Sequence, residues 1–375
     1  MSVRLRERKG RSESANYGNR CSLWKMPTAL LLGSVLCVGP VKGQEADRKP
    51  NEADSVQETN PTAVESADRG RIIVVLGAAG TKEFGDEFAE AAERWRETAK
   101  SSGMKLDIVG LQESGKENDR EQVQRLLEET GTQATSHLWL VLIGHGTYAR
   151  DQAKFNLRGP DFSAKELSSW LQNVKRPVVV VNCSSASGPF VNRLSGPNRV
   201  IVSATKSGAE QNYARFGRFF AEAIASADSD LDHDGEVSVH EAFLRASAGV
   251  ESFYEVEGRI ATEHALIDDN GDGRGTPASF FRGVRPSGKA KEGAKLDGST
   301  AARITLAPAG GRLPFTEQEL EQRDQIETQL EGLRQKRDEM DQQSFDAAVE
   351  PLLLQLARLY AAAEARDTTK DSTNP

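Results

Sequence analysis

A cysteine and a histidine each follow a run of apolar residues in the middle of the chain. His145 comes shortly after the run 138–143 and directly before Gly146, and Cys183 follows the run 178–181. Short, continuous apolar runs of this kind are typical of strands buried on both faces of a parallel sheet. Reactive groups in such sheets lie beyond the carboxyl ends of the strands, and neighbouring strands are about 4.8 Å apart. The imidazole and the thiol are therefore expected to approach each other if the two strands pair.

A thiol beside an imidazole is the arrangement that acyl transfer through a thioester requires. The sulfur of Cys183 would attack the acyl carbon, and His145 would take up the proton and return it to the leaving amine. The N–H of Gly146, with no side chain in the way, and the N–H of Cys183 would stabilise the oxyanion. The alternative is that Cys183 is a buried apolar filler, the usual role of a lone cysteine.

Two other kinds of catalytic site are not expected. The sequence has no Gly-x-Ser-x-Gly elbow, which argues against a serine α/β-hydrolase. The remaining histidines lack the spacing of zinc ligands; they are His137, His233, His240 and His264.

Segment 230–241 carries the residues of an EF-hand calcium loop at their required offsets. Carboxylates occupy positions 1, 3, 5 and 12, Gly235 at position 6 allows a sharp turn, and position 7 offers its backbone carbonyl. The expected metal ligands are Asp230, Asp232, Asp234, Glu236 and Glu241. Calcium accepts about seven such oxygen ligands, so the expected cofactor is a structural Ca²⁺. The alternative is an acidic turn without a metal.

A second acidic stretch, 268–273, has the opening of such a loop but Ser279 in place of the closing Glu. It is interpreted as either a weak ion site or a Gly/Asp turn. Because only one full loop is present, a structural brace is favoured over a calcium switch.

Strands and helices alternate through the central part of the chain. Strands are expected at 72–76, 106–111, 138–143, 178–181 and 200–203, and helices near 84–95 and at 120–129, 163–173, 213–226 and 241–248. This alternation predicts right-handed crossovers and an α/β fold with a mostly parallel sheet covered by helices on both faces.

Two longer motifs contain the histidine and the cysteine, LVLIGHGT at 140–147 and VVVVNCSSASGPF at 178–190. With them the chain resembles the caspase-like cysteine peptidases, and more closely the legumain-type family, over residues 71–283. Further stretches resemble an exported bacterial branch of that group; these are 156–161, 203–210 and 262–266.

The resemblance implies a caspase-like three-layer sandwich, with Cys183 as nucleophile and His145 as general base and acid. It also implies a protein or peptide substrate that is cut after Asn or Asp. Family members follow the nucleophile with an acidic residue and a Ser-Gly-Ser run, whereas residues 184–188 here are Ser-Ser-Ala-Ser-Gly. Two hypotheses follow: an exported, calcium-braced cysteine endopeptidase, or a catalytically inactive calcium-binding module that binds a protein partner.

The flanking segments complete the expected organisation. Residues 1–43 have a basic start and an apolar run of signal-peptide length, so an exported chain, periplasmic or secreted, is expected, with an uncleaved anchor as the alternative. The polar stretch 44–70 predicts a disordered linker, and 284–315 a flexible connection with an edge strand at 302–306. Two apolar stripes at 316–362 predict a C-terminal α-helical hairpin that contacts its own chain or a partner, followed by a disordered tail at 363–375.

Charge limits the class of partner. The chain carries 48 basic and 56 acidic residues; residues 1–43 hold eight of the basic and two of the acidic ones, so the rest has a net charge of −14. A body this acidic is not expected to bind nucleic acid, whose phosphates need Lys and Arg. No membrane contact is expected after signal cleavage, because no later segment is apolar enough to cross a bilayer.

Overall fold

The computed structural model of the chain describes residues 69–112, 115, 117–130, 136–232, 234–287, 296–306 and 315–371. The expected signal segment and all but the last two residues of the expected linker lie outside these ranges, as do residues 288–295 and 307–314 of the connection 284–315. Within the described part of the chain, none of the helices combines the length and the apolar character that a membrane crossing needs.

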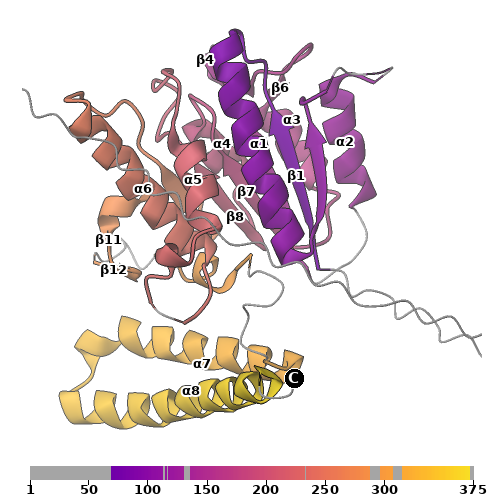
Figure 1. Cartoon of the computed structure of the whole chain (residues 1–375). Helices are drawn as coiled ribbons and strands as arrows, with labels where there is room; N and C mark the ends of the chain where they lie inside the picture. Colours follow the sequence, from indigo (N-terminus) through magenta and orange to yellow (C-terminus); the bar gives the residue numbers. More distant parts are fainter. Residues whose placement is uncertain are drawn as a thin grey trace, which may run out of the picture. The chain divides into compact units, whose positions relative to one another are not determined.

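A seven-stranded sheet in the order β10-β9-β8-β7-β3-β1-β2 forms the centre of the described structure (Figure 1). Its five parallel strands are those that the sequence predicts, and they pair in parallel with one another. They are β1 (Arg71–Leu76), β2 (Lys105–Val109), β3 (Leu138–Ile143), β7 (Val178–Asn182) and β8 (Arg199–Ser203). Two short antiparallel strands extend one edge, β9 (Leu266–Asp268) and β10 (Thr276–Pro277). The mostly parallel α/β sheet is thereby confirmed.

Helices cover both faces of this sheet and make the predicted three layers. One apolar cluster joins alternate strand residues to α1 (Lys82–Ser102), α5 (Phe216–Ile224) and α6 (Val239–Val256). The opposite cluster joins the remaining strand residues to three other helices, α2 (Asp119–Glu129), α3 (Ala164–Leu171) and α4 (Gly188–Leu194). Period-two alternation along each strand therefore decides which layer a side chain enters.

Several small elements were not predicted from the sequence. A three-stranded antiparallel sheet follows His145 and consists of β4 (Gly146–Ala149), β5 (Gln152–Phe155) and β6 (Phe162–Ser163). A two-stranded ribbon is formed by β11 (Phe281–Arg282) and β12 (Arg285–Pro286). Short 3-10 helices add η1 (Ala227–Ser229), η2 (Ala278–Phe280), η4 (Ala301–Arg303) and η5 (Arg337–Glu339).

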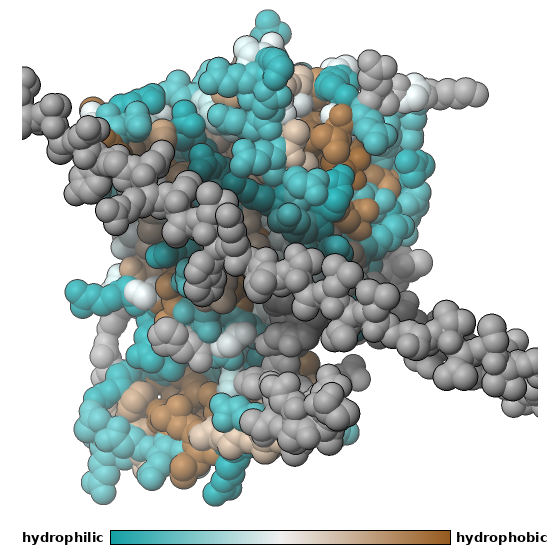
Figure 2. Space-filling model, viewed as in Figure 1, coloured by the Kyte–Doolittle hydropathy of each residue, from teal (hydrophilic) through white to brown (hydrophobic). Residues whose placement is uncertain are grey.

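The predicted helical hairpin is formed by α7 (Glu317–Gln335) and α8 (Gln342–Asp371). Its two helices are held by the Phe315–Tyr360 ring contact at 5.2 Å and by the ion pair between Arg366 and Glu319. Figure 2 shows hydrophobic side chains gathered on the visible face of the hairpin.

Two sequence predictions in this part of the chain are wrong. The expected edge strand 302–306 is instead the 3-10 helix η4 followed by a single bridge between Ser238 and Thr305, because one short segment reaches only one residue of a partner strand. The expected disordered tail 363–375 continues as helix to Asp371, since the run Ala361–Ala363 favours helix strongly.

His240 in α6 is a buried histidine whose ring makes no hydrogen bond among the described residues. It is 1% exposed, its ring lies 4.5 Å from the Phe281 ring, and neither ring nitrogen has a hydrogen-bond partner. Burial lowers the pKa of His240 from 6.5 to about 4.

This burial predicts acid sensitivity. Between pH 6.5 and 4 the unfolded chain binds a proton at His240 that the folded chain does not, so the free energy of unfolding falls as the pH falls. His240→Leu should remove up to ~3 kcal/mol of this loss. Urea unfolding of wild type and variant at pH 7 and pH 4, with chelator present, measures the difference; equal losses in the two proteins would contradict the prediction.

Candidate functional site

Cys183 follows β7, and its side chain points into the apolar layer beneath α5. The residue is 4% exposed and belongs to the same apolar cluster as Val179 and Val181. A Cβ built on Gly217 of α5 would lie 2.6 Å from the Cys183 Cβ and 3.0 Å from its sulfur. The thiol therefore packs against helix backbone, and its hydrogen bond is to the Val181 carbonyl at 3.8 Å.

This environment opposes ionisation of the thiol. Burial raises the pKa of the Cys183 thiol far above its ordinary value, and the carboxylate of Glu263 raises this pKa further. A thiolate is the nucleophilic form of cysteine, and reactive cysteines have lowered pKa values in electropositive, partly exposed surroundings. Cys183 is instead buried, and the charge that acts on its thiol is the carboxylate of Glu263.

His145 lies just beyond the end of β3, the strand next to β7 in the parallel register. Its ring is half-buried among the rings of Phe84, Phe88 and Tyr213, at centroid distances of 4.8, 5.7 and 5.6 Å. Its Nε2 lies 3.2 Å from the carbonyl oxygen of Ala79. The predicted placement at adjacent strand ends is thus found, but among the described residues no hydrogen bond joins the imidazole to the thiol.

Both expected oxyanion donors already have partners. The N–H of Cys183 donates to the Leu142 carbonyl at 2.8 Å, and the N–H of Gly146 donates to the Ser185 hydroxyl at 3.0 Å. The Ser184 hydroxyl in turn donates to the Asn182 side chain at 2.7 Å. The serines at the point where the sequence departs from the legumain pattern therefore fill the strand ends with buried hydrogen bonds.

The lack of a side chain at Gly146 has a structural use. A Cβ there would lie 2.1 Å from the Ser185 carbonyl oxygen and 3.0 Å from the Ser184 hydroxyl. The glycine therefore lets the strand-end loops of β3 and β7 touch, which is a different use from leaving an N–H open to a substrate.

A cavity of about 220 Å³ lies at the carboxyl ends of β3 and β7 and reaches Cys183. Ile143 and Gly144 from the β3 end, together with α1 and α5, form much of its wall. The remaining wall combines charged and aromatic side chains, among them Glu87, Glu90, Arg94, Tyr213, Arg215, Arg218 and Phe253. Mixed lining of this kind can bind a ligand that has both an apolar body and polar groups.

Glu263 is a buried residue for which sequence reasoning found no role. Its carboxylate accepts hydrogen bonds from the N–H groups of Arg215 and Phe216 at 2.8 to 3.0 Å and from the Tyr254 hydroxyl at 3.2 Å. Arg215 is the N-cap of α5 and provides no side-chain cap of its own. Glu263 thus caps the helix that buries Cys183. In the sequence, segment 262–266 contributes to the family resemblance but gives no sign of this capping role.

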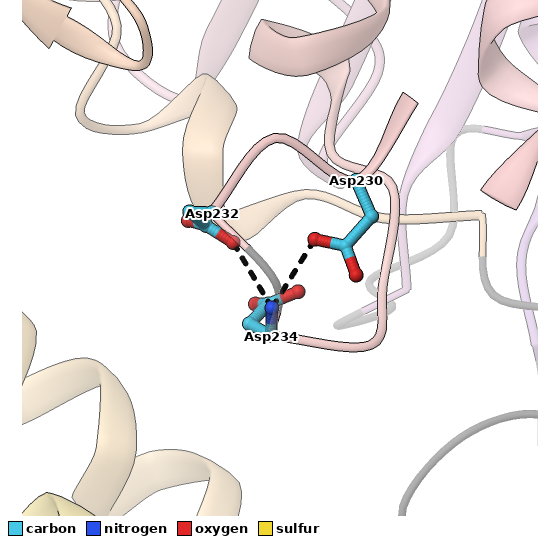
Figure 3. A group of neighbouring side chains, drawn as sticks. All are labelled: Asp230, Asp232 and Asp234. Atoms are coloured by element: carbon cyan, nitrogen blue, oxygen red, sulfur yellow. Dashed lines mark hydrogen bonds between the residues drawn. The ribbon is translucent and has the colours of Figure 1, made fainter. Parts of the chain in front are cut away.

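The acidic side chains of the 230–241 loop converge as the calcium-loop spacing predicts (Figure 3). One carboxylate oxygen from each of Asp230, Asp232 and Asp234 lies within 4.8 Å of the others. The N–H of Asp234 donates to both Asp230 and Asp232 at 3.2 Å. Glu241, 2% exposed, joins the two ends of the loop, because its carboxylate accepts from the N–H of Leu231 at 2.7 Å and of Ser238 at 2.9 Å.

Glu236 uses its side chain and its backbone for different contacts, as the calcium-loop pattern allows. Its side chain forms a buried ion pair with Arg323 of α7 at 3.3 Å. The backbone carbonyl is the group that the calcium-loop pattern assigns to this position.

Comparison with solved structures gives distant likenesses, of which two are caspases. The Drosophila initiator caspase Dronc is 14% identical with a TM-score of 0.39, over 56% of this chain and 82% of that one. Caspase-1 from Spodoptera frugiperda is 10% identical with a TM-score of 0.36, over 54% of this chain and 86% of that one. No protein-family profile and no curated protein matches the sequence. Likenesses this weak assign neither a residue role nor an activity to the chain.

The cap formed by Glu263 predicts a large stability loss when its charge is removed. Glu263→Gln replaces charge-assisted acceptors by a neutral amide and should lower the free energy of unfolding by about 2 to 4 kcal/mol. Glu257→Gln, an exposed change of the same chemistry, is the control and should alter it by less than about 0.5 kcal/mol. Chemical denaturation measures both; equal effects would show that Glu263 does not act as a buried cap.

Proposed function

We propose that the chain is an exported, calcium-stabilised caspase-like module that binds a segment of a protein partner without cleaving it. The observation that carries this proposal is the burial of Cys183 against Gly217 of α5. The raised pKa of the thiol and the occupied N–H groups of Gly146 and Cys183 support it further. An acyl-transfer site needs a nucleophile that can ionise and donors that can receive an oxyanion.

The cavity at the carboxyl edge of the sheet is the proposed binding site for the partner. Ligands of open α/β sheets bind outside the carboxyl ends of the strands. Arg215 and Arg218 would attract acidic groups of a peptide, and Phe219 and Phe253 would contact its apolar groups. Partner contact through the hairpin α7–α8 remains a second proposal of the same kind.

The 230–241 loop is the proposed Ca²⁺ site, and its residues fit the ion. Carboxylates of Asp230, Asp232, Asp234 and Glu241 and the carbonyl of Glu236 would hold it. The ion would supply positive charge that offsets the converging carboxylates. The loop ends lie next to η1 and α6, so the bound ion would fix the start of α6, which packs against α5.

A cysteine endopeptidase that cleaves after Asn or Asp is the second candidate. It is favoured by one observation: His145 and Cys183 follow adjacent parallel strands, and Cys183 borders the cavity. This activity would require the sulfur to leave its contact with Gly217 and to reach the imidazole.

Thiol labelling separates the two candidates. Native protein treated with iodoacetamide, or with an Asn- or Asp-directed acyloxymethyl ketone, should label slowly at Cys183, and at the same rate in His145→Ala, because the buried thiol is not ionised. Unfolding in denaturant should raise the rate by a hundredfold or more. Peptide mapping by mass spectrometry assigns the label to Cys183.

The endopeptidase would give the opposite result. Rapid, stoichiometric ketone labelling of the native protein that is lost in His145→Ala would establish a catalytic thiol and end the non-catalytic proposal.

Calcium should stabilise the folded chain. At a concentration one hundred times the Kd, one ion contributes about 2.7 kcal/mol, which corresponds to a rise in Tm of about 5 to 10 °C. Asp230→Asn combined with Glu241→Gln should lose the part of the Tm rise that this ion contributes, and Glu257→Gln should keep the full rise. Scanning calorimetry with calcium and with chelator measures the shifts. A wild-type Tm independent of calcium, or an undiminished rise in the double variant, would exclude the loop as a calcium site.

A further inference from the structure

The second acidic stretch, 268–274, repeats the hydrogen-bonded turns of the 230–241 loop. Asn270 Oδ1 accepts from the N–H of Asp272 at 2.8 Å, and Asp272 Oδ1 accepts from the N–H of Arg274 at 2.7 Å. In the 230–241 loop the side chains at the same offsets accept from residues two further on. Gly273, at the position that corresponds to Gly235, also has a positive φ, 76° against 86°.

The closing carboxylate that this stretch lacks in sequence is provided by Asp297. In the 230–241 loop, Glu241 Oε1 accepts from the N–H groups of loop positions 2 and 3, at 2.7 and 3.2 Å. In the second stretch, Asp297 Oδ1 accepts from the N–H groups of Asp269 and Asn270, which are also positions 2 and 3, at 3.0 and 3.3 Å. Ser279, at position 12 by sequence, is exposed in η2 and takes no part.

An independent observation points to a cation here. Asp268, Asp269 and Asp297 are 0%, 6% and 3% exposed, and among the described residues none of the three forms an ion pair with Lys, Arg or His. Oδ2 of Asp268, the residue at loop position 1, is buried without a hydrogen-bond partner. The Ser195 hydroxyl lies beside the Asp268 carboxylate and is itself buried without a hydrogen-bond partner. Buried carboxylates without counter-charge are costly, and orphaned oxygens are the atoms that a bound ion satisfies.

We propose that Asp268, Asn270, Asp272 and Asp297 form a second Ca²⁺ site, closed by a residue from outside the loop. The carbonyl of Arg274 stands at loop position 7 and adds a further oxygen. All these ligands are oxygen atoms, which is the donor set of Ca²⁺; Mg²⁺ demands fewer ligands in stricter geometry.

The second site is connected to the first through one segment. The Asp269 carboxylate accepts from the N–H groups of Thr300 and Ala301, both at 2.8 Å. Three residues later, Ile304 accepts from the N–H of Val239, the first residue of α6, at 2.8 Å. Residues 297–305 thus run from the second loop to the end of the first. Both ions would therefore stabilise the same segment, 297–305.

Counting bound ions tests the second site separately from the first. Isothermal titration of the chelator-treated full chain with Ca²⁺ should give two ions for wild type and for the control Glu257→Gln. One ion should remain in Asp230→Asn with Glu241→Gln, and one in Asp297→Asn. The triple combination should bind none. Circular dichroism verifies that each variant is folded.

A second variant keeps the test decisive if Asp297→Asn fails to fold. Asp272→Ala removes an exposed ligand oxygen, leaves the buried set intact, and should also remove one ion. If Asp230→Asn with Glu241→Gln abolishes all binding in a folded chain, the second site is overturned and the first stands. If wild type binds one ion that is lost only with Asp297→Asn or Asp272→Ala, the second site stands and the first is overturned. Full binding in both Asp297→Asn and Asp272→Ala would also overturn the second site.

Discussion

The side-chain alternation of β7 determines what the most reactive residue of the chain can do. Val179, Val181 and Cys183 follow one another on the face of the sheet that α1 and α5 cover, whereas Val178 and Val180 face the opposite layer. The sulfur therefore meets the backbone of α5 at Gly217, a contact too close for any larger residue at that position. Glu263, by capping α5, holds the helix in the place that buries the thiol. A cysteine that follows the strand next to the one before His145 is thus combined with the surroundings of a core residue.

The acidity of the body is the second physical constraint. Carboxylates converge in the 230–241 loop, and a second set, Asp268, Asp269 and Asp297, is buried without an ion pair among the described residues. Arg323 from the hairpin pairs with Glu236 and provides one positive charge. The proposed Ca²⁺ ions would provide the remaining positive charge. The two loops contact opposite ends of one segment, 297–305. The proposed ions would stabilise the α5 and α6 side of the sheet, which also contains the cavity and Cys183.

Sequence reasoning was most accurate where a local pattern fixes the structure. Continuous apolar runs predicted all five parallel strands, and the offsets of the 230–241 loop predicted its converging aspartates. It failed where distant residues decide. In the β4–β5 turn, Arg150 and Asp151 have positive φ angles, and such residue types do not predict this conformation from sequence. Asp297 meets a loop almost thirty residues earlier, and Glu263 caps a helix 47 residues earlier. Whether the Cys183 side chain is buried depends on which face of the sheet α5 covers, and tertiary packing decides that.

The central claim, that Cys183 is a core residue, is tested most directly by the ionisation of its thiol. The ultraviolet absorbance of the thiolate, followed against pH in the native protein with Cys183→Ala as the blank, gives the pKa of this group. For a core thiol we expect no titration near the ordinary value of about 8.5 until the chain unfolds. A thiolate that forms below pH 7 in the folded protein, and that is lost in His145→Ala, would show instead that Cys183 is a reactive thiol activated by the imidazole.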